Sequence, residues 1–200
     1  MTVWREPAAA LPRGPVLFLD RDGVVIEDRN YLDDPDQVVL VPGAAAAMAR
    51  ARAAGFRLVG LSNQSGLGRG LFGPEALAAV MARLDALLAA GGAAFDAFHY
   101  CPHAPADKCG CRKPAPGLLH DAAVRVPFDP RRSWLVGDKA SDVALGRDAG
   151  LSAVLVRTGH GTASAAEVAA RWAGDRRVLE VADLPAAVDL ILAAAGPEAP

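Results

Sequence analysis

Two aspartates two positions apart are the residues with the clearest chemical potential in this sequence. Asp20 and Asp22 flank Arg21, directly after the apolar residues 16–19 and directly before Gly23. A short apolar run that ends in acids and glycine indicates a buried parallel strand that stops at a reaction site. Since side chains alternate along an extended chain, we expect Asp20 and Asp22 on one side and Arg21 on the other.

Two carboxylates this close raise each other's proton affinity unless a cation lies between them. One acid would then be ionised on a metal and the other available for proton transfer, which is the division of labour that nucleophilic catalysis needs. The alternative is a turn in which both aspartates only accept hydrogen bonds from the backbone. Because the pattern Asp-x-Asp-Gly is short, it leaves both interpretations open.

Polar residues also follow later apolar segments. Ser62 and Asn63 come after a second apolar segment, Asp138 comes after another, and Lys113 lies in a loop before a predicted helix. Asp142, four positions after Asp138, belongs either to the same site or to the first turn of a helix. This set is close to complete for phosphoryl transfer, because that chemistry mainly requires positioning and neutralisation of charge on the phosphoryl oxygens.

Each group has a task in such a reaction. Asp20 would attack phosphorus, and Asp138 would help it hold a hard cation such as Mg²⁺, which prefers oxygen ligands. Ser62 and Lys113 would bind the phosphoryl oxygens. Asp22 would protonate the leaving oxygen and then take a proton from the water that hydrolyses the aspartyl phosphate.

The three cysteines form a second chemical cluster with one histidine. Cys101, His103, Cys109 and Cys111 lie within eleven residues. An odd number of cysteines in a short window argues against disulfides and favours metal ligation in a reducing compartment. Three thiolates and one imidazole predict tetrahedral, structural Zn²⁺, which would fold the loop and fix the two basic residues after it. Unliganded buried cysteines and an iron–sulfur cluster are the alternatives.

The predicted elements place these groups at one edge of a sheet. Apolar strands are expected at residues 16–19, 56–61, 95–100, 133–136 and 153–156. Helices are expected at residues 42–54, 74–90, 116–124 and 142–148, and the remainder of the chain is helical in composition, particularly residues 184–195. This alternation predicts a three-layer α/β fold with a doubly wound parallel sheet, which binds ligands at the carboxyl ends of its strands.

The domain organisation is expected to be simple. A flexible N-terminal arm over residues 1–14 precedes a single domain over residues 15–196, which includes a zinc-binding loop at residues 101–111. The short spacing between Asp22 and Ser62 leaves no room for a cap domain, so loops alone should cover the site.

Bulk composition narrows the range of partners. A chain of 200 residues with 52% hydrophobic content is enough for one buried core. A net charge of −2 gives no electrostatic reason to expect a nucleic acid or an anionic membrane as the partner. Neither a signal-type segment nor a run of about 20 apolar residues is present. We expect a cytoplasmic monomer that acts on a small soluble molecule.

Four segments resemble the ordered motifs of the haloacid dehalogenase-type phosphatases. They are residues 19–24, 62–66, 111–114 and 137–139. With the cysteine cluster, the resemblance points to the capless, zinc-containing group of this family. It implies a Rossmann-like phosphatase core and an aspartyl-phosphate mechanism, with Asp20 as the nucleophile and Asp22 as the general acid and base.

The resemblance also implies roles for the other polar residues. Mg²⁺ would be bound by Asp20, Asp138 and the backbone carbonyl of Asp22, while Ser62 and Lys113 would stabilise the phosphoryl group. The implied substrate contacts are Asp28, Arg29, Asn30, Tyr31, Asn63, Gln64, Ser65, Arg69, Arg112 and Lys139.

The substrate loops resemble family members that act on heptose bisphosphates more than members that act on histidinol phosphate. Histidinol phosphatases usually carry an acid where Ser65 stands. Two positions depart from the group, since Ser62 is usually threonine and Asn30 is usually glycine. The expected activity is Mg²⁺-dependent removal of the 7-phosphate from a heptose 1,7-bisphosphate. Histidinol phosphate, a polynucleotide 3′-phosphate and a non-catalytic, zinc-stabilised binding module are the alternatives.

Overall fold

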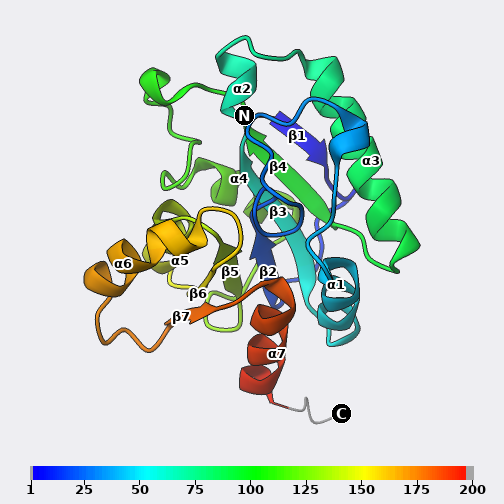
Figure 1. Cartoon of the computed structure of the whole chain (residues 1–200). Coiled ribbons are helices and arrows are strands. Elements are labelled where there is room, and N and C mark those ends of the chain that lie inside the picture. Colours follow the sequence, from blue (N-terminus) through cyan, green and yellow to red (C-terminus); the bar gives the residue numbers. More distant parts are fainter. Residues whose placement is uncertain (1, 197–200) are drawn as a thin grey trace.

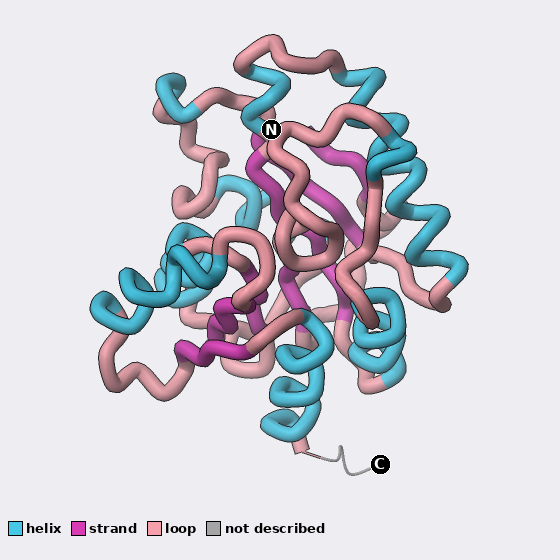
Figure 2. Tube along the Cα trace, in the orientation of Figure 1, coloured by secondary structure: helices cyan, strands magenta, loops and turns pink. Residues whose placement is uncertain are grey.

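The structure, a computed structural model, describes residues 2–196 of the chain. These residues form one sheet of seven strands in the order β1-β4-β3-β2-β5-β6-β7 (Figures 1 and 2). The strands are β1 (Thr2–Arg5), β2 (Val16–Leu19), β3 (Arg57–Asn63), β4 (Ala97–Cys101), β5 (Trp134–Gly137), β6 (Ser152–Val156) and β7 (Val178–Val181). Every neighbouring pair is parallel except β1 and β4, so the predicted α/β sheet is confirmed.

Helices cover both faces of the sheet and complete three layers (Figure 1). One face carries α1 (Ala44–Ala53), α3 (Pro74–Ala90) and α7 (Leu184–Ala195), and the other carries α4 (Gly117–Arg125), α5 (Ala140–Asp148) and α6 (Gly161–Arg171). In the central strand β2, Leu17 and Leu19 pack toward the first set, while Val16 and Phe18 pack toward the second. Because both faces of β2 are buried, its sequence is a continuous apolar run.

The strand order reverses at β2, which has β3 on one side and β5 on the other. Ligands of open α/β sheets bind outside the carboxyl ends of the strands at such a switch point. The pairing of β2 with β5 continues into the loop, where Asp20 N donates to Val136 O at 3.0 Å. The acids after β2 therefore stand beside the polar residues that end β3 and follow β5.

The chain between Asp22 and Ser62 contains no inserted domain. It holds a short 3₁₀ helix, η1 (Pro35–Gln37), followed by α1 and most of β3. The site is covered by loops alone, as the spacing predicts. Within residues 2–196, no helix is long and apolar enough to cross a membrane.

The amino end differs from the expectation of a flexible arm over residues 1–14. Residues 2–5 form β1, which adds an antiparallel edge strand to β4. Trp4 Nε1 and Arg5 Nη2 both donate to Asp85 Oδ2, at 3.1 and 2.8 Å, and Asp85 lies in α3. This contact joins residues 80 positions apart, so local composition gave no sign of it.

The carboxyl-terminal region also departs from the helical expectation. Helices α6 and α7 are present, but β7 lies between them and pairs in parallel with β6, with Val178 opposite Ala153. None of the four residues of β7 is fully buried, because the strand lies at the sheet edge. A strand this short in an alanine-rich and arginine-rich region produces only a weak β signal.

Candidate active site

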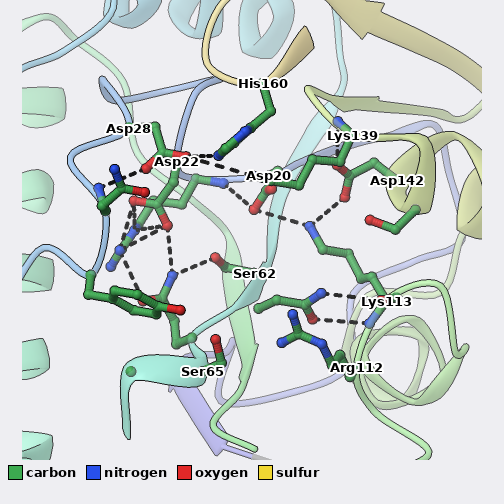
Figure 3. A pocket seen from close by; sticks show the side chains of 17 residues that line it. Asp20, Asp22, Asp28, Ser62, Ser65, Arg112, Lys113, Lys139, Asp142 and His160 are labelled. Carbon is green, nitrogen blue, oxygen red and sulfur yellow. Dashed lines mark hydrogen bonds and ion pairs between the residues drawn. The ribbon is translucent and has the colours of Figure 1, made fainter. Parts of the chain in front are cut away.

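A cavity of about 340 Å³ opens at the carboxyl ends of β2 and β3 (Figure 3). Most of the predicted site residues line it: Asp20, Asp22, Asp28, Asn30, Tyr31, Ser62, Asn63, Gln64, Ser65, Arg112, Lys113 and Lys139. Five further lining residues were not assigned to the site from the sequence: Arg21, Gly66, Ser141, Asp142 and His160. The structure thus brings most of the predicted residues together at one sheet edge and adds lining residues that the sequence did not assign.

Two predicted substrate residues lie outside this lining. Arg29 forms an ion pair with Glu27 at 2.6 Å, and both side chains are about half exposed. Arg69 reaches the site only through Tyr31, since its guanidinium lies 5.7 Å from the centre of that ring. Arg29 therefore does not line the cavity, and Arg69 is separated from it by the ring of Tyr31.

A buried lysine joins two carboxylates at the base of the cavity. Lys113 Nζ lies 3.1 Å from Asp20 Oδ1 and 2.6 Å from Asp142 Oδ1, and it donates to Leu61 O at 2.6 Å (Figure 3). Burial alone would lower the pKa of Lys113, but the two carboxylates outweigh it and raise that pKa. Lys113 is therefore a permanent positive charge held beside Asp20.

The same ammonium keeps Asp20 ionised. Burial would raise the pKa of Asp20, but the charges of Lys113 and Lys139 lower it. Arg21 N also donates to Asp20 Oδ1 at 2.7 Å, which fixes the direction of the carboxylate. An ionised and oriented carboxylate is the form in which an aspartate can attack phosphorus.

Asp142 settles a question that the sequence left open. It lies in the first turn of α5, yet its side chain is fully buried and pairs with Lys113. Its carboxylate also accepts a hydrogen bond from Lys139 N at 3.1 Å. Asp142 is thus part of the site, where it orients both lysines, as well as part of a helix terminus.

The carboxylates at this edge suit a hard cation. Oxygen atoms of Asp20, Asp138 and Asp142 lie within 4.8 Å of one another. Burial and the neighbouring carboxylate of Asp20 raise the pKa of Asp138 to about 7, although Lys139 opposes the rise, so a cation there would favour the ionised carboxylate. A Cβ on Gly23 or Gly159 would collide with Asp138 Oδ2, so both glycines allow close backbone packing around that carboxylate. Carboxylate oxygens such as those of Asp20 and Asp138 fit Mg²⁺.

Asp22 is held by a network that the sequence did not reveal. Arg21 Nη2 donates to Asp22 Oδ1 and Oδ2 at 2.8 and 2.9 Å, and Gln64 Nε2 donates to Asp22 Oδ2 at 2.8 Å. The expectation that Arg21 turns away from Asp22 was therefore wrong. The alternation of side chains holds only within β2, which ends at Leu19. After it the chain makes a tight turn, in which Gly23 has a φ of +77° and Arg21 O accepts from Val25 N.

Both polar atoms of the Asn63 side chain bond to the protein backbone, so the amide is not free to bind a ligand. Its Oδ1 accepts from Lys113 N at 3.0 Å, and its Nδ2 donates to Lys113 O at 3.3 Å. This pair of bonds ties the end of β3 to the loop that carries the buried lysine. Asn63 lines the cavity, but its side chain already serves to place Lys113.

The rim of the cavity on the α5 side carries a polar cluster. Lys139 Nζ lies 3.1 Å from Asp138 Oδ1 and 3.8 Å from Asp28 Oδ2, and His160 Nε2 lies 3.1 Å from Asp28 Oδ2. His160 N donates to Asp138 Oδ2 at 2.8 Å. These contacts anchor the loop with Asp28 above the carboxylate cluster and leave Lys139 at the cavity wall.

The cysteine loop brings its four predicted ligands together. The Sγ atoms of Cys101, Cys109 and Cys111 lie 3.1–3.5 Å apart, and His103 Nδ1 lies 3.2 Å from Cys111 Sγ. Backbone hydrogen bonds from Cys111 and Arg112 oppose the effect of burial and lower the pKa of Cys109 to about 6. Burial instead raises the pKa of Cys101 to about 12, so a cation would be needed to hold that sulfur as a thiolate. Three convergent sulfur atoms and one imidazole nitrogen fit a tetrahedral zinc ion.

Fold and site together define a HAD-like hydrolase. A family profile described as HAD-hydrolase-like matches residues 110–184. The chain belongs to the family of the D-glycero-beta-D-manno-heptose-1,7-bisphosphate 7-phosphatases. It is 40% identical to the member from Bordetella bronchiseptica over 153 residues, which cover 76% of this chain and 86% of that protein. The Yersinia pestis member is 37% identical over 183 residues, which cover 87% and 95%.

Solved structures agree with this assignment. A crystal structure of D,D-heptose 1,7-bisphosphate phosphatase from B. bronchiseptica, complexed with magnesium and phosphate, superposes with a TM-score of 0.82 at 36% identity, covering 90% of this chain and 99% of that one. A HAD-like phosphatase from Mesorhizobium loti superposes with a TM-score of 0.76 at 34% identity, covering 94% of both chains. The chain is therefore a phosphatase of phosphorylated sugars, as the motifs implied.

Proposed function

We propose that this phosphatase uses Mg²⁺ and an aspartyl-phosphate intermediate to remove the 7-phosphate of D-glycero-D-manno-heptose 1,7-bisphosphate. The observation that carries the proposal is the buried array of Asp20, Lys113 and Asp142 at the switch point of the sheet. The relatives with matching sequences are named for this reaction, and that name supplies the substrate.

In the first step, an ionised oxygen of Asp20 attacks phosphorus and the bond from phosphorus to the sugar oxygen breaks. The electron pair of that bond goes to the sugar oxygen, which takes a proton from Asp22. Lys113 and the Ser62 hydroxyl bind phosphoryl oxygens as their charge is redistributed. In this structure Asp22 is 20% exposed toward the cavity, while Lys113 and Ser62 are buried at its base.

In the second step, Asp22 takes a proton from a water molecule while the water oxygen attacks phosphorus. The bond from phosphorus to Asp20 breaks, so Asp20 returns to its ionised form and phosphate leaves. One water is consumed and no redox change occurs. Asp22 thus acts first as an acid and then as a base, which the two steps require in turn.

Asp20, Asp138 and the backbone carbonyl of Asp22 would hold the magnesium ion in this proposal. When bound, the cation neutralises charge on the phosphoryl oxygens and on the carboxylates around them. Asp142 would take no part in holding it, because its carboxylate is committed to Lys113 and Lys139 N.

Arg112 supports binding of a second phosphate. Its guanidinium lines the cavity, and its buried Nη1 has no hydrogen-bond partner among the residues described. A buried donor without a partner costs free energy that an anionic ligand would recover. A bisphosphate could bind with one phosphate at Asp20 and the other at Arg112, in the cavity that Ser65, Asn30 and Tyr31 also line.

Relative kcat/KM values test the substrate. Both family substrates share the phosphoryl chemistry, so only leaving-group contacts should separate them. We expect kcat/KM for the heptose 1,7-bisphosphate to exceed that for histidinol phosphate by at least about 100-fold, because one phosphate contact is absent from histidinol phosphate. A preference for histidinol phosphate would contradict the proposed substrate. Failure to release phosphate from any monoester with Mg²⁺ present would instead favour a non-catalytic binding module.

Loss of the zinc ligand Cys109 should destabilise the protein. We expect about one equivalent of Zn²⁺ in the purified protein and a Tm lower by roughly 5–10 °C in Cys109→Ser, because the loop depends on the ion for its fold. Metal analysis and thermal unfolding measure both. Ser65→Ala, a change outside the cluster, should keep the zinc. A zinc-free protein with an unchanged Tm in Cys109→Ser would contradict a structural ion.

The proposal also retains a monomeric state and a cytoplasmic location. Light scattering after size-exclusion chromatography tests the first, and fractionation of the source cells tests the second. A dimer would leave the chemistry above unchanged, since all the proposed catalytic groups come from one chain.

A further inference from the structure

Arg21 is a buried arginine whose charge is paired with one carboxylate. It is only 1% exposed, and Asp22 is the only carboxylate within ion-pair distance of it among residues 2–196. Nε and Nη2 both donate to the carboxylate, which fixes its position and its rotation. A buried ion pair is a poor source of stability, because an apolar side chain of similar volume often stabilises a core as well. The cost of burying this guanidinium therefore calls for a functional explanation.

Gln64 extends the network, and its neighbours fix how its amide points. Gln64 Oε1 accepts from Arg21 Nη2 at 3.0 Å, and a guanidinium can only donate. Gln64 Nε2 must therefore face the other way, where it donates to Asp22 Oδ2 and to Ser62 Oγ, both at 2.8 Å. Both protons of this amide are used inside the protein.

The bond to Ser62 has a consequence for its hydroxyl proton. Because Ser62 Oγ accepts from Gln64 Nε2, its own O–H must donate in another direction, and the open direction is the cavity that Ser62 lines. A phosphoryl oxygen in the cavity would receive that proton. One glutamine thus contacts both the proposed acid/base and the proposed phosphoryl-binding hydroxyl.

We propose that Arg21 and Gln64 are positioning residues, which hold the Asp22 carboxylate and the Ser62 hydroxyl in their reacting orientations without touching the substrate. Gln64 was expected to contact the substrate, but the residue is only 5% exposed and its side-chain amide bonds to Arg21, Asp22 and Ser62. The inference rests on the proposed roles of Asp22 and Ser62 and adds the residues that make those roles possible.

The two positioning residues have different kinetic signatures. The value of kcat/KM reports steps through departure of the leaving group, and only a poor leaving group needs a proton from Asp22 at that point. An alkyl ester such as the sugar phosphate needs it, whereas p-nitrophenyl phosphate does not. Arg21 bonds the Asp22 carboxylate directly and reaches Ser62 only through Gln64, so the larger part of its loss should depend on the leaving group. Gln64 also acts on Ser62, which serves every substrate.

Arg21→Met tests the inference. The substitution keeps most of the side-chain volume and removes the guanidinium that donates to both oxygens of Asp22. The Asp22 carboxylate can still reach water in the cavity. We expect kcat/KM for the heptose bisphosphate to fall by about 100-fold and that for p-nitrophenyl phosphate by less than about fivefold. Arg21→Lys, which keeps the charge, should recover part of the loss. An equal fall for both esters, or no fall for either, would overturn the inference.

Two controls separate positioning from a general loss of structure. Arg147→Met removes another nearly buried arginine, which pairs with Asp175 at 2.8 Å far from the cavity, and should leave the ratio of the two kcat/KM values unchanged. In an Asp22→Asn background, Arg21→Met should cause no further loss with the heptose bisphosphate, because its target is gone. If Arg21→Met lowers kcat/KM for the heptose bisphosphate as much in the Asp22→Asn background as in the wild-type background, the inference is overturned. This comparison needs only the one substrate.

Gln64→Met supplies a second variant if Arg21→Met fails to fold. It should lower kcat/KM for both esters through Ser62, and lower that of the heptose bisphosphate by at least about tenfold more through Asp22. Wild-type values for both esters would overturn the role of Gln64. Failure of the wild-type protein to hydrolyse either ester would contradict the proposed function, which distinguishes the two failures.

Discussion

Replacement of Asp20 by Asn is expected to reduce kcat by at least about 10⁴-fold, because a neutral amide is too weak a nucleophile to form the acyl phosphate that the reaction requires. The fold should persist, since Asn has nearly the same shape and Lys113 keeps its contact with Asp142 at 2.6 Å. Phosphate release under saturating heptose bisphosphate and Mg²⁺ measures the change, and thermal unfolding confirms that the variant is folded.

Asp85→Asn provides the matched control for this change. Asp85 also accepts hydrogen bonds through its carboxylate, from Trp4 and Arg5, but it lies beside the edge strand β1 and not in the cavity. The kcat of this variant should stay within about twofold of wild type, while its stability falls by about 1 kcal/mol as β1 loosens. Substantial turnover by Asp20→Asn would mean that another group attacks phosphorus.

Replacement of Lys113 by Met is expected to damage both activity and stability. Loss of the charge beside Asp20 should lower kcat/KM by about 10³-fold, the size of effect that follows removal of a preorganised donor. It also leaves Asp20 and Asp142 buried without their cation, which should lower the free energy of unfolding by about 3–5 kcal/mol at pH 7.5.

The stability loss in Lys113→Met should depend on pH in a defined direction. Without the ammonium, the folded-state pKa values of Asp20 and Asp142 rise above their unfolded values, so the folded state favours the protonated carboxyls. The deficit is then smallest at acid pH and grows as pH rises through the range between the unfolded and folded values. Urea unfolding at pH 5 and pH 7.5 measures it.

Lys139→Met is the matched control, because it removes a lysine charge that is partly exposed and not buried like that of Lys113. Lys139 also pairs with Asp138, but its side chain is 39% exposed, so solvent screens the interaction and the stability loss should be below about 1 kcal/mol. Equal unfolding midpoints for Lys113→Met and wild type would show that the buried pair of carboxylates does not need the ammonium.

The sequence was most informative where local pattern and burial coincide. The ranges predicted for α3 and α7 match the structure residue for residue, because a proline or leucine start, an apolar stripe and a glycine exit are all local signals. The polar strand ends were found for a similar reason, since a run such as Val16 to Leu19 can end only where the sheet meets a loop or a site.

Contacts between distant residues were the parts that the sequence could not supply. The direction of Arg21 depends on a turn at Gly23 and on Gln64, 43 positions away. The role of Asp142 depends on Lys113, which arrives from a different loop. Strand β1 depends on Asp85, and spacing along the chain carries no record of such a pairing.

The zinc loop lies between these two cases. Its four ligands fall within eleven residues, so spacing alone was enough to predict their convergence. Its connection to the active site was also expected, because Arg112 and Lys113 follow Cys111 directly. What the sequence did not show is the pair of hydrogen bonds from Asn63, which fixes Lys113 from the side of the sheet.

Covalent capture of the intermediate tests the central claim most directly. The protein is mixed with heptose bisphosphate and Mg²⁺, quenched in acid within the first turnover, and treated with borohydride, which reduces an acyl phosphate to the alcohol. Peptide mass spectrometry should then find the modification on Asp20. A modification on any other residue, or stoichiometric phosphate release in the first turnover with Asp20 unmodified at every quench time, would contradict the account.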